Sequence, residues 1–141
     1  MPLKSEKKCT VNKGSARHLY EYAVVRYVPS IEREEFVNIG LIMMCKRARW
    51  IKVRFSVNED RIRILSPALE ADALKHQLEG FERVVAADTK EGGEIATLDA
   101  HERFRWLTAV RSASIQTSRP HAGLAKDLEA TFDELFRALV L

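Results

Sequence analysis

The feature that most constrains the fold is the segment Phe36–Cys45, which is apolar on both of its alternating faces. A strand of this kind lies inside a sheet and is covered by other elements on each side. It follows Tyr20–Val28, a stretch rich in aromatic and β-branched residues that ends at Pro29 and predicts a first strand. We therefore expect a sheet that is built around Phe36–Cys45.

The next segment alternates between an apolar and a basic face, which predicts a β-hairpin. The apolar positions are Ile51, Val53 and Phe55, followed after a turn by Ile62 and Ile64. With the two earlier strands, this hairpin would complete an antiparallel N-terminal meander. A shorter fifth strand is expected over Ser112–Ser118.

Up to three helices follow from apolar stripes and capping signals. The first is expected to begin at Ser66-Pro67, because serine is a good N-cap and proline suits the first helical position. Asp99 with Glu102 three residues later forms a capping-box pattern for the second. The third begins at about Asp127. The apolar stripe of the first helix comprises Leu74, Leu78, Phe81 and Val85, and that of the last comprises Leu128, Phe132, Leu135 and Leu139. Strands first and helices later predict an α+β protein, with an antiparallel sheet of four to five strands and two to three helices packed on it.

Length and charge favour one domain with a basic tail. The chain has 141 residues, 46% of them hydrophobic, which suffices for one core. Residues 1–19 hold five basic residues and one acidic, whereas the rest hold 18 basic and 19 acidic residues. We therefore expect a flexible basic tail over 1–19 and a nearly neutral domain over 20–141. Two cysteines, no secretory leader and no apolar run of membrane-spanning length predict a cytoplasmic protein with no membrane contact.

No segment carries the spacing of a known catalytic, metal or cofactor motif. Gly92-Gly93 is not followed by the residues of a phosphate loop, and no Gly-x-Ser-x-Gly sequence occurs. The four histidines are scattered without a partner at metal-ligand spacing, so we expect no metal and no cofactor. Cys45, at the end of an apolar strand, is expected to be a small buried hydrophobic residue.

The first candidate site is a polar pocket on the central strand. Asn38 and Gly40 share a face with Phe36, Ile42 and Met44 if the strand is regular. Asn38 could then fix a ligand that Gly40 admits. Alternatively, Asn38 holds the preceding loop and Gly40 gives room to an aromatic ring.

The second candidate is a polar seam between the start of that strand and the later helix–strand unit. It comprises Arg33, Glu35, Arg103, Arg111, Ser112 and Gln116. Arg111 could bind a carboxylate or phosphate. The structural alternative, which we predict, is that Glu32 or Glu35 pairs with Arg103 or Arg111 and locks helix to sheet.

The third candidate is the basic face of the predicted hairpin, formed by Trp50, Lys52, Arg54, Arg61 and Arg63. Interleaved aromatic and cationic residues can stack bases and contact phosphates. The alternative is a solvated face that long charged side chains keep soluble.

At several of these segments the chain resembles a bacterial family titled only as domain-of-unknown-function family 3037. The match runs over about residues 20–140. It is carried by Tyr22-x-x-x-Arg26-Tyr27-x-Pro29, Glu32-Arg33-x-Glu35-Phe36-Val37-Asn38-Ile39-Gly40, Arg103-Phe104-x-Trp106-Leu107, Arg111-Ser112, Ile115-Gln116 and Leu135-Phe136. The resemblance implies small cytoplasmic stand-alone proteins with no established activity, whose genes lie beside those for HipA-like kinases.

Three functions remain open. The leading hypothesis is a non-catalytic binding or accessory protein that acts through a protein partner, with a HipA-like kinase implied by the resemblance. The second is a nucleic-acid-binding protein that uses the basic hairpin face and the tail. The third is a small enzyme for an anionic substrate, which requires Arg33, Glu35, Asn38 and Arg111 to converge on one cleft.

Overall fold

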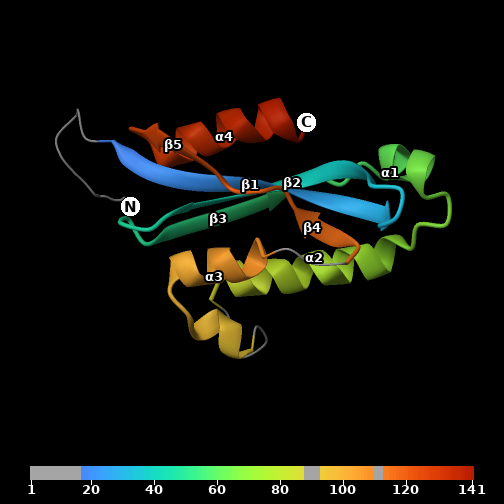
Figure 1. The fold of residues 1–141 in the computed structure, drawn as a ribbon, viewed down its shortest axis with the longest axis horizontal. Helices are drawn as coiled ribbons and strands as arrows, with labels where there is room; N and C mark the ends of the chain where they lie inside the picture. Colours follow the sequence, from blue (N-terminus) through green and yellow to red (C-terminus); the bar gives the residue numbers. More distant parts are fainter. Residues whose placement is uncertain (1–16, 88–92, 110–112) are drawn as a thin grey trace.

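The computed structural model describes residues 17–87, 93–109 and 113–141 (Figure 1). In this part of the chain, five strands form one antiparallel sheet, with four α-helices and one 3-10 helix. The strands are β1 (His18–Ser30), β2 (Glu35–Cys45), β3 (Trp50–Phe55), β4 (Ile115–Thr117) and β5 (His121–Ala125). The helices are α1 (Glu59–Leu65), α2 (Ala71–Val85), η1 (Glu94–Thr97), α3 (Ala100–Leu107) and α4 (Leu128–Leu139). The predicted α+β class is confirmed, with one helix more than expected.

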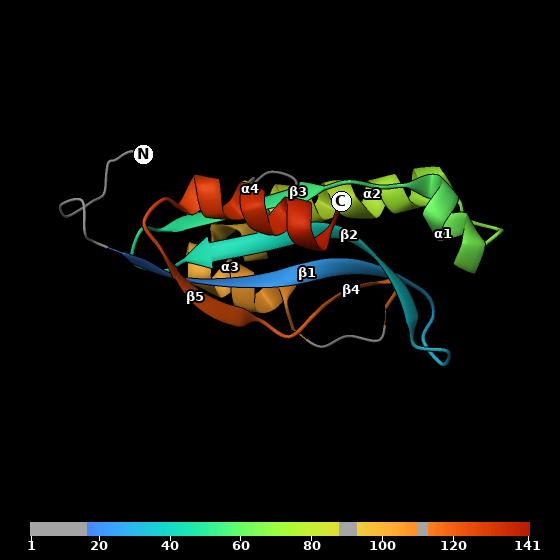
Figure 2. The same ribbon diagram turned by 90° about the horizontal axis from the view of Figure 1, so that it is seen from above.

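The sheet has the order β3-β2-β1-β4, and β5 also pairs with β1. β5 pairs with the first half of β1 and β4 with the second half, so the two short strands follow one another along the same edge of β1 (Figure 2). Each of these pairings is antiparallel. The edge opposite β5 and β4 is formed by β3.

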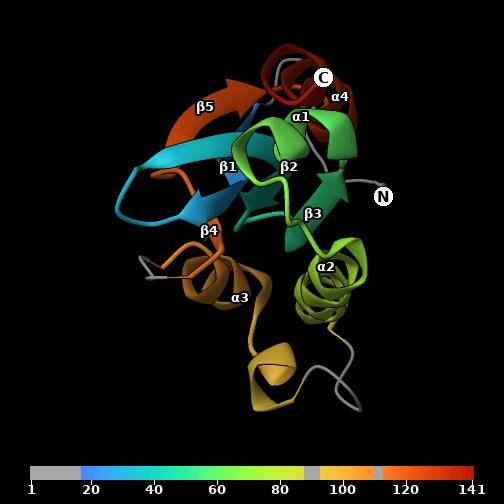
Figure 3. The same ribbon diagram turned by 90° about the vertical axis from the view of Figure 1, so that its right-hand side faces the viewer.

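β2 lies inside the sheet and is covered on both faces, as its sequence predicts. α4 packs on one face, and α2 and α3 pack on the other (Figure 3). The larger apolar cluster, on the α2–α3 face, includes Ile39, Ile42 and Phe104. The smaller cluster, beneath α4, includes Leu41, Met43 and Phe132. A strand that is apolar on both faces therefore serves two cores.

A β-bulge in β2 changes which face Asn38 occupies. Val25 is opposite Gly40, but the next residue, Arg26, is opposite Asn38, so Ile39 is the extra residue. Because of this extra residue, Ile39 joins the same cluster as Ile42, and Asn38 turns toward α4. The expectation that Asn38 shares a face with Ile42 and Met44 is wrong.

The prediction of a second hairpin strand is also wrong, because α1 occupies Glu59–Leu65. The Asn58 side chain caps this helix by accepting a hydrogen bond from the Arg61 backbone N–H. Ile62 is buried while Ile64 is 78% exposed, so the two residues do not share a face. An alternation of two apolar residues is too short to distinguish a strand from a single helical turn.

The later elements agree with the sequence in type, with shifted boundaries. Ser66 is the C-cap of α1 rather than the start of the next helix, and α2 begins at Ala71. The capping box at Asp99 and the helix start after Asp127 are confirmed. β4 covers only Ile115–Thr117 of the predicted fifth strand. β5 has no counterpart in the sequence prediction, because His121–Ala125 lacks β-branched and aromatic residues.

Candidate functional site

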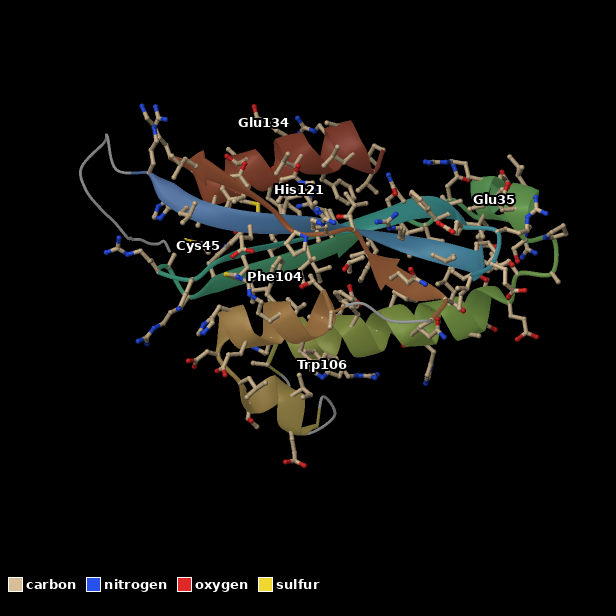
Figure 4. The ribbon with its side chains drawn as sticks, in the orientation of Figure 1. Glu35, Cys45, Phe104, Trp106, His121 and Glu134 are labelled. Carbon is tan, nitrogen blue, oxygen red and sulfur yellow. The ribbon has the colours of Figure 1, made fainter. Side chains whose placement is uncertain are left out.

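The predicted polar seam does not form among the described residues. Glu35 accepts a hydrogen bond from Arg33 Nε at 2.7 Å, and both side chains are exposed beside the turn that joins β1 and β2. This pairing lowers the pKa of Glu35 and raises that of Arg33. Glu35 and Cys45 mark opposite ends of β2 (Figure 4). Arg111 and Ser112 lie outside the described residues.

Arg103 bonds to backbone carbonyl groups instead of to Glu32 or Glu35. Its Nε donates to Leu98 O at 3.0 Å, and its Nη1 donates to Val84 O at 3.1 Å and Val85 O at 2.8 Å. The residue is only 8% exposed, and this desolvation lowers the pKa of its guanidinium. Arg103 therefore connects the end of α2 to the segment that leads into α3, and the predicted pairing is wrong for this residue.

Asn38 and Gly40 both have structural contacts. Asn38 Nδ2 donates to Leu139 O at 3.1 Å, so the side chain holds the end of α4 rather than the preceding loop. A Cβ atom on Gly40 would overlap the ring of Phe55, which confirms the alternative that this glycine gives room to an aromatic ring. Gln116 Nε2 donates to Ala113 O at 2.8 Å, which is a local contact. Of the described members of the proposed enzyme site, Arg33 and Glu35 bond to each other, whereas Asn38 bonds to the end of α4.

The basic face of the predicted hairpin is divided between two elements. Trp50 Nε1 and Lys52 both bond to Glu129 of α4, and Arg54 Nη1 donates to Asp133 at 3.0 Å. The Trp50 ring packs edge-on against Phe132 of α4. Arg61 and Arg63 lie on α1, where Arg63 contacts Glu59. The five residues therefore do not form one surface on which a nucleic acid could stack.

A cleft that the sequence did not predict lies between the β2–β3 turn and the start of α3. Its volume is about 700 Å³, and Leu98 and Ala100 form its apolar part. Its charged and polar lining consists of Lys46, Arg47, Arg49, Asp99, His101 and Arg103. We call it the basic cleft. The sequence signal for this cleft was the basic turn Lys46-Arg47-Ala48-Arg49. Nothing in the sequence indicates that α3 lies against this turn.

The basic cleft has an uncompensated positive charge. Four of its lining residues are cationic, and Asp99 is the acidic one. Within the described ranges, none of Lys46, Arg47 and Arg49 forms an ion pair, and all three are exposed. The first residues of α3 line the same cleft. The Asp99 side chain accepts the Glu102 backbone N–H, and the other N–H groups of this first helical turn have no acceptor within the helix. Such an arrangement attracts oxyanions.

Two exposed leucines lie at the same end of the sheet. Leu19 of β1 is opposite Leu124 of β5, and they are 60% and 59% exposed. Both lie on the α3 face, because Tyr20, the next residue, packs beneath α4. Since Glu21 is opposite Met44, Leu19 lies level with the turn that begins at Lys46. We call Leu19 and Leu124 the leucine pair.

Cys45 lies behind this turn and is buried, as expected from the sequence. It is 1% exposed, and burial raises the pKa of its thiol. Among the described residues, no three His, Cys, Asp or Glu side chains gather at metal-binding distance. No helix within the described ranges is long and apolar enough to cross a membrane.

The fold and the cleft define a small α+β protein with a cationic surface at one end of a helix-covered antiparallel sheet. Residues 22–140 match the family described as "Protein of unknown function (DUF3037)". The chain belongs to this family, and the resemblance seen in the sequence is confirmed. No curated protein and no solved structure matches the chain.

Proposed function

We propose that this chain is a non-catalytic accessory protein that binds a protein partner through the leucine pair and the basic cleft. The observation that carries the proposal is that Leu19 and Leu124 are register partners and are both exposed, with Leu124 on the edge strand β5 and Leu19 level with a cationic turn. Protein interfaces combine apolar anchor residues with a polar rim, and exposed apolar groups with such a rim mark interaction sites.

The edge strand supports the same proposal. Among the described residues, β5 pairs only with β1, so its outer backbone groups face away from the sheet. An edge of this kind can receive an extended segment of a partner through backbone hydrogen bonds. The leucine pair would then supply the apolar contact.

The first partner to test is a HipA-like kinase from the same organism, which the family resemblance suggests. The tagged wild-type chain is incubated with the purified kinase and, in parallel, with native cell extract. The variant Leu19→Ser/Leu124→Ser is compared with Ile31→Ser/Ile64→Ser, which removes two exposed aliphatic side chains from other parts of the surface. We expect at least a tenfold loss of partner binding for the leucine variant and an unchanged amount for the control.

Three results would contradict the proposal. The first is an absence of any enriched protein while the chain stays monomeric at micromolar concentration. The second is equal binding by the two variants. The third is enrichment that disappears after nuclease treatment, which would instead support the nucleic-acid alternative. Sedimentation of the chain alone shows whether the leucine pair joins two copies of it.

A further inference from the structure

We propose that the basic cleft is an oxyanion-binding site that receives an acidic segment of the protein partner. This inference rests on the proposed function and assigns the chemistry of the cleft. The bound groups are carboxylates, or phosphates carried by the same segment. The leucine pair would contact an apolar residue next to the acidic ones.

The cations of the cleft suit bidentate oxyanions. Three of the four are arginines, whose planar guanidinium groups match the geometry of carboxylate and phosphate oxygens. Arg47 and Arg49 are exposed on a short turn and have no carboxylate partner within the described ranges. An acidic segment could therefore bind these two arginines without first breaking an ion pair.

Arg103 adds a fixed charge at the wall of the cleft. Nε and Nη1 donate to three carbonyl groups, whereas Nη2 donates to no group among the described residues. The side chain is more than nine-tenths buried and still lines the cleft. The hydrogen-bond partners of this guanidinium are neutral, and the nearby Asp99 carboxylate offsets only part of the cationic charge of the cleft, so a ligand oxyanion would add compensation.

The first turn of α3 lies beside the same space. Ala100 and His101 both line the cleft at the beginning of the helix. Asp99 is the opposing charge, and its carboxylate is already engaged as the N-cap of α3, where it accepts the Glu102 backbone N–H. Cations therefore outnumber acids in the lining by four to one.

The surroundings favour a protein segment over a nucleic acid. The described lining includes no Phe, Tyr or Trp side chain, and the imidazole of His101 is its one aromatic ring. Leu98 lies inside the cleft and Leu19 lies level with the turn. An acidic peptide with a neighbouring apolar residue complements both features.

The test measures binding of a fluorescein-labelled hexaglutamate peptide to the full chain by anisotropy. A second peptide ends in leucine, and inorganic phosphate and an oligothymidylate of equal charge compete with it. The cleft variant is Arg47→Gln/Arg49→Gln. Its control is Arg61→Gln/Arg137→Gln, which removes two exposed arginines outside the cleft. Thermal unfolding checks that each variant is folded.

We expect the cleft variant to weaken peptide binding at least tenfold and the control to change it less than twofold. Added leucine should tighten binding to the wild type but not to Leu19→Ser/Leu124→Ser. Equal loss in both arginine variants would overturn the proposal, because it would show only diffuse charge attraction. An oligothymidylate that binds tenfold more tightly than the peptide would also overturn it. Partner binding that survives the cleft variant would refute the cleft while leaving the leucine pair in place.

Discussion

At the scale of single residues, the backbone of Arg49 is the most informative feature of the cleft. Its φ is 51°, in the left-handed region, and its N–H closes the β2–β3 turn on Lys46 O at 3.2 Å. Glu34 has φ 55° in the β1–β2 turn, closed on Ile31 O at 3.3 Å. Glycine adopts this conformation without steric cost. Each turn therefore holds a charged side chain where glycine would be more stable.

Glycine at either position should raise stability, but only one replacement should affect binding. Arg49→Gly and Glu34→Gly are each expected to add about 0.5–1 kcal/mol to the free energy of unfolding, because the relieved strain exceeds the added chain entropy. Urea unfolding measures this gain. Arg49→Gly should also weaken hexaglutamate binding, whereas Glu34→Gly should not. An Arg49→Gly variant that is more stable and binds normally would remove Arg49 from the site.

At the scale of secondary structure elements, charged side chains set how helices are placed on the sheet. Arg105 of α3 donates from Nη1 and Nη2 to the two Glu21 oxygens of β1, each at 2.7 Å. Lys52 and Arg54 of β3 pair with Glu129 and Asp133 of α4 through one hydrogen bond each. α3 and α4 are thus each held by an apolar face and by at least one ion pair to a strand.

The contribution of the Glu21–Arg105 pair to the free energy of unfolding should depend on pH. The hydrogen bonds from Arg105 lower the pKa of Glu21 below its usual value. A carboxyl with a lowered folded-state pKa stabilises the protein above its unfolded pKa, about 4.3, and loses this contribution as the pH falls through the folded value. Glu21→Gln should therefore cost less than about 1 kcal/mol at pH 7, since Arg105 is half-exposed.

Urea unfolding at pH 7 and at pH 3 tests this expectation. The difference between wild type and Glu21→Gln should shrink on acidification. Arg105→Gln should reproduce the loss at pH 7, and the double variant should lose no more than either single one. A constant difference at both pH values would show that the effect arises from packing and not from the charge.

At the scale of the whole molecule, one sheet separates two apolar clusters of unequal size. The smaller cluster depends on α4, whose Phe132 is fully buried and stacked on Phe136. Lys52 and Arg54 lie 5.0 Å and 5.3 Å from the Phe132 ring centroid, so this ring also receives two cations. α4 covers the polar face of β3, whereas the cationic turn that precedes β3 stays exposed beside α3.

Phe132→Ala should reduce the free energy of unfolding by about 3–5 kcal/mol, because the cavity lies between two tightly packed layers. That is a large fraction of the roughly 5–15 kcal/mol that holds a domain of this size. Phe36→Ala, at an aromatic residue that is 45% exposed, is the matched control and should cost far less. Denaturation followed by circular dichroism measures both, and similar losses would show that α4 does not hold the second cluster.

The candidate site could be predicted only in part. The sequence identified Asn38, Gly40 and Arg103 as residues with unusual requirements, and each has a specific contact. The partners predicted for Asn38 and Arg103 were wrong. The bulge in β2 places the Asn38 side chain on the opposite face of the sheet. Arg103 bonds to backbone carbonyl groups, which every residue carries and which a sequence therefore cannot single out. The basic cleft escaped prediction since its two walls are about 50 residues apart in the chain.

The sequence by itself determined the α+β class, the buried central strand and the capped starts of α3 and α4. These follow from hydrophobic periodicity and capping residues, which act over a few neighbouring positions. Only the tertiary structure decided that α4 covers the basic residues of β3, that β5 completes the edge, and that α3 meets the turn at Lys46–Arg49. Such contacts join segments that are distant in the chain. They form only when helices pack on both apolar faces of the sheet at the same time.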